Sequence, residues 1–92
     1  MEPRIVHAIE HRRRLRLTYN GKPRFLEPQC YGVGTKGAEL LRVCQLRGGT
    51  EREPLFDVAR ISEIVVIDDT FQAPGPQYKH GDSAVREIYC QQ

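Results

Sequence analysis

The sequence predicts a mainly β protein: a small, strongly bent, antiparallel SH3-like or Sm-like barrel of about five strands, with a short N-terminal helix and a C-terminal arm. Five short strand-like runs follow one another between residues 15 and 68. Asn20-Gly21, residues 35–37 and Gly48-Gly49 separate the first four runs, and they accept the backbone angles of tight turns. Short strands with such turns are typical of a sheet that closes on itself.

The first element in this pattern is a short amphipathic helix over residues 3–12. Pro3 fits the first turn of a helix, where its missing N–H is not needed. Ile5, Ala8 and Ile9 recur at helical spacing, so one face of the helix is apolar. We expect this face to cover one end of the β-structure.

A β-hairpin follows the helix. Apolar and polar residues alternate over residues 15–19, which is typical of a half-buried strand. Asn20-Gly21 is a strong signal for a two-residue hairpin turn, because both residues tolerate positive φ. The chain then returns over residues 22–31, where Pro28 indicates an edge or a bend.

Three further strands are expected at residues 39–46, 55–58 and 63–68, with a tight corner at residues 59–61. The last of them is centred on Ile-Val-Val-Ile and is apolar on both faces. Because a chain of this size has little core, we expect one of these faces, or the C-terminal arm, to be buried on a second copy. The sequence therefore predicts a homodimer.

The composition changes after residue 71, which divides the chain into a β-barrel domain with its helix (residues 1–71) and a C-terminal arm (residues 72–92). The arm begins with Ala-Pro-Gly-Pro, the composition of a linker or an extended segment. Residues 83–92 fit either a helix or a strand. We favour a helix, because Asp82 or Ser83 would cap it.

Length and composition restrict the function classes. The chain has 92 residues and forms one small domain, so we expect no deep catalytic cleft. No apolar run approaches the roughly 20 residues that cross a membrane, and the N-terminus has no apolar signal segment. Three widely spaced cysteines without a CxxC pair indicate reduced, buried thiols. Together these features predict a cytoplasmic protein.

The charge is distributed unevenly along the chain. Residues 1–47 hold ten Lys and Arg against four Asp and Glu, and residues 48–92 hold four against eight. The two halves therefore carry +6 and −4. This asymmetry favours a polyanion or an acidic partner for one face, although a folded domain can also interleave its halves and cancel the field.

Several features in this order resemble the WYL domain of bacterial transcriptional and defence regulators, over roughly residues 5–71. They are a short helix ending in Ala8-Ile9, a first strand ending in Tyr19, Pro28 in the second strand, and a corner that reads Phe56-Asp-Val-Ala-Arg60-Ile61. The tripeptide that names the family is Glu39-Leu40-Leu41 here, and Pro54 replaces the family's arginine two residues before the phenylalanine.

The resemblance implies a regulatory role. In members of that family a helix-turn-helix reads DNA while the WYL barrel senses a ligand, thought to be a nucleotide or single-stranded nucleic acid. This chain has no room for a helix-turn-helix. The resemblance therefore implies a stand-alone sensor or an accessory module of transcription regulation, with DNA binding supplied by a partner regulator protein.

The opening arginines suggest a binding face. Arg14 and Arg16 share the polar side of the first strand, and we expect Lys22 and Arg24 to lie across the hairpin from them, with Tyr19 close by. Cations around an aromatic ring suit a nucleotide or a single-stranded nucleic acid, since the cations neutralise phosphate and the ring stacks on a base. The alternative is that the arginines are solvated and Tyr19 belongs to the core.

Arg60 is the second candidate for this site. It sits in the tight corner between apolar residues, with Asp57 three residues before it. Its guanidinium could offer two parallel hydrogen bonds to a phosphate or carboxylate. It could equally fix the corner by binding Asp57 or a backbone carbonyl, and the sequence does not choose between these roles.

The sequence contains no arrangement that predicts catalysis, a metal or a cofactor. His7 and His11 share a helix face, but no cysteine or carboxylate completes a metal site with them. His80 has Ser83 nearby, but residues so close in sequence rarely reach the geometry of a catalytic pair. We therefore expect a ligand-sensing or nucleic-acid-binding regulatory module rather than an enzyme, with a protein-interaction or oligomerisation module as the alternative.

Overall fold

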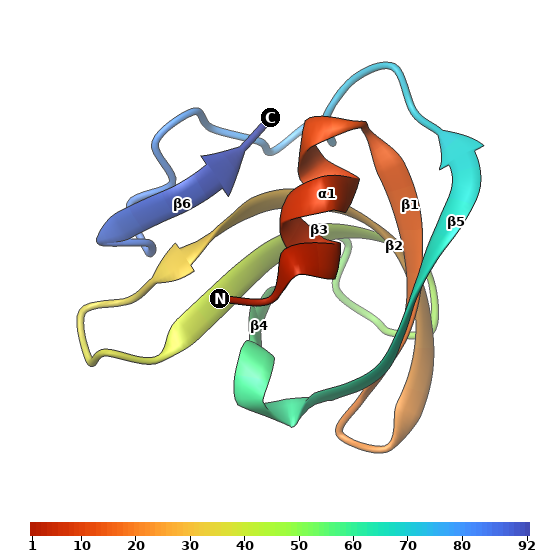
Figure 1. Ribbon diagram of the computed structural model, residues 1–92, viewed down its shortest axis with the longest axis horizontal. Helices are drawn as coiled ribbons and strands as arrows, with labels where there is room; N and C mark the ends of the chain where they lie inside the picture. Colours follow the sequence, from red (N-terminus) through yellow and green to blue (C-terminus); the bar gives the residue numbers. More distant parts are fainter.

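The computed structural model describes residues 1–92 and shows one antiparallel sheet of six strands with a short helix against it (Figure 1). The elements are α1 (Pro3–Glu10), β1 (Arg13–Tyr19), β2 (Lys22–Val33), β3 (Glu39–Arg47), β4 (Leu55–Asp57), the 3₁₀ turn η1 (Val58–Arg60), β5 (Ile61–Thr70) and β6 (Glu87–Gln91). The mainly β class is confirmed.

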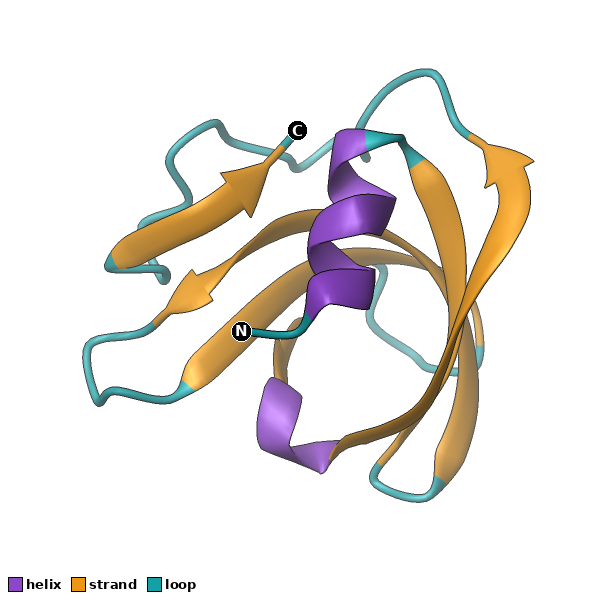
Figure 2. Cartoon of the chain, in the orientation of Figure 1, coloured by secondary structure: helices purple, strands orange, loops and turns teal.

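The strand order is β4-β3-β2-β1-β5, and β6 pairs with β2. The sheet curves around the core, and α1 lies across its inner side (Figure 2). Barrel closure is not found, because β4 and β5 follow one another through η1 without pairing.

The helix begins where the sequence predicts. Pro3 occupies its first turn, and the Glu2 side chain accepts a hydrogen bond from the Arg4 amide at 3.0 Å. The apolar face expected from the spacing, Ile5 with Ala8 and Ile9, is buried. The helix ends at Glu10 rather than residue 12, because the chain turns into β1 through the left-handed region (φ 52° at Arg12).

The hairpin between β1 and β2 is confirmed. Asn20 and Gly21 both have positive φ, 51° and 77°, as a tight two-residue turn requires. The turn fixes the register, since Tyr19 pairs with Lys22. Successive pairs then alternate between the two faces of the sheet.

The prediction of a helix near the C-terminus is wrong, because Glu87–Gln91 forms the strand β6. β2 has 12 residues, and β1 pairs only with the first part of it. β6 pairs with its last part, from Cys30 to Val33, and satisfies backbone groups of β2 that β1 does not reach. Gly32 permits this contact, because a Cβ there would lie 2.1 Å from the Glu87 carbonyl oxygen.

β5 is the outer strand beside β1, and only one of its faces is buried. Ile64 and Val66 pack against the core, whereas Val65 faces outward and is 50% exposed. Glu63 has φ of 54° at a register shift between β1 and β5, which marks a β-bulge. The apolar outer face expected from the sequence is therefore limited in extent.

The core lies between α1 and the inner face of the sheet. Its buried residues are Ile5, Ala8, Ile9, Leu15, Leu17, Leu26, Tyr31, Leu41, Val43 and Phe56. All three cysteines are free thiols, and burial raises the pKa of Cys30 to about 11. Neither α1 nor η1 has the length and apolar character that crossing a membrane requires.

Residues 72–82, which we name the strap, connect β5 to the last part of the chain and are bound to the sheet. The Gly75 amide donates to Gln29 at 2.7 Å, and the Gln77 amide donates to Glu53 at 2.7 Å. Gln29 and Glu53 are themselves hydrogen-bonded at 2.9 Å and are buried. The arm expected from the composition is therefore attached by specific polar contacts.

Candidate anion-binding site

One row of side chains crosses the outer face of the sheet. Arg16 on β1 pairs with Val65 on β5 and with Phe25 on β2, and Phe25 in turn pairs with Arg47 on β3. Paired residues in a sheet project to the same side. These four residues form what we call the basic row: an exposed valine, an arginine, an aromatic ring and a second arginine.

An open cleft of about 570 Å³, which we call the first cleft, lies along the basic row. Its lining residues are Arg16, Pro23, Arg24, Phe25, Arg47 and Gly48. Three of the six are arginines and none is acidic. Arg16 and Arg47 are exposed, and neither forms an ion pair. Both guanidinium groups can therefore bind an anion from solvent.

The two other arginines of β1 are already paired with carboxylates. Arg13 pairs with Asp68 at 2.8 Å. Arg14 pairs with the nearly buried Glu27 at 2.9 Å and lies 3.7 Å from Asp69. Arg13 and Arg14 are therefore neutralised by carboxylates, whereas Arg16 is not.

Arg24 does not share a face with Arg16, because it pairs with Leu17, whose side chain is in the core. Its guanidinium carbon lies 5.8 Å from the ring centres of both Tyr19 and Phe56, and Nη1 donates to Gln45 at 2.9 Å. It borders both the first cleft, along the basic row, and a pocket of about 270 Å³ at the end of the sheet. The expected face of four cations is therefore not formed.

Tyr19 and Lys22 lie at the hairpin end rather than over the basic row. The Tyr19 ring stacks on Phe56 with ring centres 3.9 Å apart, and its hydroxyl accepts from the Asp57 amide at 3.0 Å. Tyr19 is therefore a half-buried packing residue, as the alternative interpretation held. Lys22 is exposed beside the turn and lines neither cleft.

Arg60 is exposed at the end of η1 and also lines neither cleft. Its carbonyl accepts from the Asn20 amide at 3.1 Å, so its backbone joins the corner to the hairpin turn. The Asp57 carboxylate caps η1 by accepting from the Ala59 amide at 3.1 Å. Asp57 forms no ion pair with Arg60.

No protein-family model matches this chain, and comparison with curated proteins and with solved structures likewise yields no significant match. The geometry of the chain itself is therefore the basis for assigning the site. No group of three or more His, Cys, Asp or Glu side chains could hold a metal ion. The rings of His7 and His11 lie next to each other, with centres 4.2 Å apart and planes tilted by 36°.

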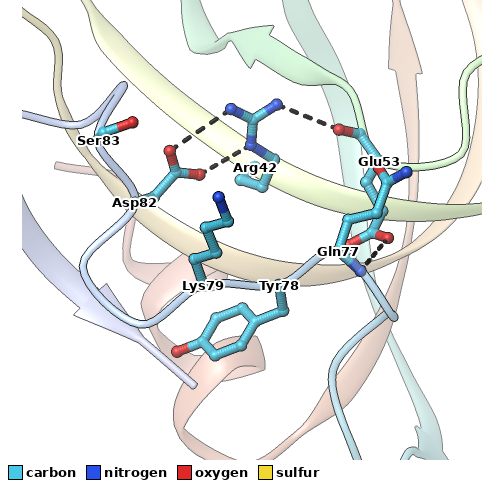
Figure 3. Close-up of a pocket in the computed structure, with 7 residues that line it drawn as sticks. All are labelled: Arg42, Glu53, Gln77, Tyr78, Lys79, Asp82 and Ser83. Carbon is cyan, nitrogen blue, oxygen red and sulfur yellow. Dashed lines mark hydrogen bonds and ion pairs between the residues drawn. The ribbon is translucent and has the colours of Figure 1, made fainter.

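A separate cleft, of about 460 Å³, lies where the strap crosses β3 (Figure 3). Arg42 donates to Asp82 at 2.8 Å and to the Glu53 carbonyl at 3.1 Å. Burial raises the pKa of Asp82, but hydrogen bonds from Arg42 and from the Ala84 amide outweigh it, so the net pKa is lowered. The charges here hold the strap in place, which makes the basic row the better candidate for ligand binding.

Three residues of the basic row, Val65, Phe25 and Arg47, were not predicted as site residues from the sequence. The position of Phe25 could have been found, because a two-residue turn at Asn20-Gly21 places Phe25 opposite Arg16. No feature of the sequence indicates that Arg47 lies opposite Phe25. Two register shifts between β2 and β3 determine its partner, and such irregularities are not visible in the sequence.

Proposed function

We propose that the protein is a binding module for an anionic ligand, a nucleotide or a single-stranded nucleic acid, and that the basic row is its site. The observation that carries this proposal is the arrangement of Arg16 and Arg47 on either side of Phe25 in one open cleft without a carboxylate. Arg13 and Arg14, on the same strand as Arg16, have carboxylate partners, but Arg16 and Arg47 do not.

Each part of the row suits one part of a nucleotide. A guanidinium group offers paired N–H donors to phosphate oxygens, and it remains charged at all physiological pH values. An aromatic ring stacks on a base for about 1 to 3 kcal/mol, with little preference among bases. Phe25 is half-buried, so its ring is fixed by the sheet before any ligand arrives.

Arg24 adds a third cation at the border of the cleft. Its guanidinium is held against Tyr19 and Phe56, and it donates to Gln45 rather than to an acid. It therefore contributes positive potential without losing much conformational freedom on binding. The three arginines together favour anions of several charges over small monovalent ones.

The finer architecture and the family are part of the same proposal. We infer that the sheet is an SH3-like barrel left open between β4 and β5, and that the chain is a divergent WYL-type accessory module. The strand order and the position of Phe56, Arg60 and Ile61 at the β4–η1–β5 corner support this. A reducing compartment such as the cytoplasm suits its three free thiols.

Fluorescence anisotropy with a labelled single-stranded oligonucleotide, titrated at several salt concentrations, tests the proposal. We expect binding at low salt that weakens with a log–log slope of about −0.7 for each phosphate contacted. Arg16→Ala and Arg47→Ala should each weaken binding and flatten the slope by about 0.7.

Two matched controls remove a cation elsewhere. Lys36→Ala removes an exposed cation in the β2–β3 turn, and Arg13→Ala removes an arginine that Asp68 already neutralises. Both should leave affinity and slope nearly unchanged. Equal losses in all four variants would mean that net charge alone attracts the ligand, and absence of binding at low salt would refute the proposal.

The alternative, a protein-interaction or oligomerisation module, has one observation in its favour. Val65 is 50% exposed at one end of the basic row, on a strand whose outer edge pairs with nothing. Pairing of β5 with the same strand of a second copy would, however, bring Glu63 and the aspartates of the two strands together. We therefore keep the homodimer as the second candidate.

A further inference from the structure

The basic row does not end at Arg47. Arg47 also borders a neighbouring cleft of about 330 Å³, which we call the second cleft, between β3 and the loop that leads to β4. The residues that line it include Cys44, Gln45, Arg47, Glu51 and Arg52. Arg52 thus shares this cleft with Arg47, just as Arg47 shares the first cleft with Arg16.

Arg52 reaches the same outer face as the row. Cys44 pairs with Glu27, the partner of Arg14, so its side chain lies on that face. Arg52 and Cys44 line the same cleft, so the Arg52 side chain lies at this face as well. Arg52 is exposed and forms no ion pair.

The loop that carries Arg52 is held in position. The Gln45 amide donates to the Arg52 carbonyl at 2.7 Å, and the Gln45 side chain donates to the Glu51 carbonyl at 2.7 Å. The same side chain accepts from Arg24 at 2.9 Å, so one glutamine connects the loop to the first cleft. The backbone that carries Arg52 is therefore held at a defined place beside β3.

The surface from Arg16 over Arg47 to Arg52 is longer than one nucleotide. Arg16 and Arg47 are separated by two strand spacings, or about 10 Å, and Arg52 lies beyond Arg47. A mononucleotide carries its charge at one end and cannot reach all three arginines. A chain of nucleotides presents one phosphate after another and can.

We propose that the ligand is a single-stranded oligonucleotide that crosses the sheet from Arg16 over Phe25 to Arg47 and enters the second cleft at Arg52. This inference rests on the proposed function, because it extends the same site. Arg47 and Arg52 bring two positive charges to the second cleft, and Glu51 reduces the net charge there to +1. The second cleft should therefore add to affinity without binding a mononucleotide on its own.

A length series tests the inference: labelled oligothymidylates from one to eight nucleotides, at fixed low salt. We expect affinity to rise steeply to about four nucleotides, the low end of site sizes for small β-domains, and then to level off. Arg52→Ala should lower the affinity for the longer strands roughly tenfold and flatten their salt slope by about 0.7, without changing the weak binding of thymidine monophosphate.

Lys36→Ala is the matched control, since it removes an exposed cation far from both clefts. Maximal affinity already at one nucleotide, with Arg16→Ala still deleterious, would overturn the inference and leave the proposed function standing. Equal effects of Arg52→Ala and Lys36→Ala on the longer strands would also overturn it. Absence of binding at every length would instead refute the proposed function itself.

Discussion

Arg16 on β1 and Phe25 on β2 lie directly opposite each other across the first hairpin, on the outer face of the sheet. The residue on the other side of Phe25 is Arg47, so the ring has a cation on each flank. Cross-strand partners on one face are close enough to touch the same small ligand. This arrangement leads to predictions in which the ring and the cations have separable effects.

Replacing Phe25 by leucine should weaken nucleic-acid binding without changing its salt dependence. The substitution removes the stacking surface, worth about 1 to 3 kcal/mol per base, but no charge. Phe25→Tyr keeps the ring and should bind almost as well as the wild type. Anisotropy titrations at three salt concentrations give both quantities, and a flatter slope for Phe25→Leu would show that the ring acts only by holding the arginines.

Val65→Lys distinguishes the proposed function from the alternative. The side chain is 50% exposed and pairs with Arg16, so a lysine there adds a cation to the end of the basic row. We expect tighter oligonucleotide binding and a salt slope steeper by up to about 0.7. Light scattering on the same samples reports the mass. A dimer that Val65→Lys dissociates, with oligonucleotide binding unchanged, would favour the interaction module instead.

The hairpin shows how far the sequence determines the site. Its turn at Asn20-Gly21 fixes which residues face each other, and the same rule that pairs Arg16 with Phe25 places Arg24 opposite Leu17. The predicted face of Arg14, Arg16, Lys22 and Arg24 did not take this alternation into account. The hairpin was predicted correctly, but the face on which Arg24 lies was not.

Other features depend on long-range pairing. The ion pairs between Arg13 and Asp68 and between Arg14 and Glu27 decide which arginines remain available, and one of them joins residues 55 positions apart. The last strand, β6, is too short for its pattern to separate a helix from a strand. Residues 87–91 become a strand because they pair with the part of β2 that β1 leaves unpaired. That free edge of β2 exists only in the folded sheet.

Gly32→Ala should detach β6 from β2 and leave the rest of the sheet folded. The added methyl carbon would lie 2.1 Å from the Glu87 carbonyl oxygen and 2.6 Å from a Val85 methyl group. Both neighbours belong to the C-terminal part of the chain, so separation of that part relieves the clash. Hydrogen exchange should show faster exchange in residues 87–91, while β1 and β3 stay protected. Gly37→Ala, in an open turn with positive φ, is a control for backbone strain alone.

Asp82→Asn tests how the strap depends on pH. Asp82 is hydrogen-bonded to Arg42, and its pKa is lowered in the folded protein. A group with a lowered folded pKa stabilises the fold above its unfolded pKa, about 4, and this stabilisation is lost as the pH falls through the folded pKa. We expect Asp82→Asn to reduce the free energy of unfolding at pH 7 by about 1 to 3 kcal/mol.

The difference between the wild type and Asp82→Asn should then shrink as the pH falls below about 4, because the wild-type carboxylate becomes protonated as well. Urea denaturation from neutral to acidic pH measures it, and the contributions of the other carboxylates cancel in the comparison. Asp68→Asn is the matched control, since Asp68 is fully exposed in its pair with Arg13 and such pairs contribute little. A difference for Asp82→Asn that stays constant down to acidic pH would show that the carboxylate holds the strap by its shape and not by its charge.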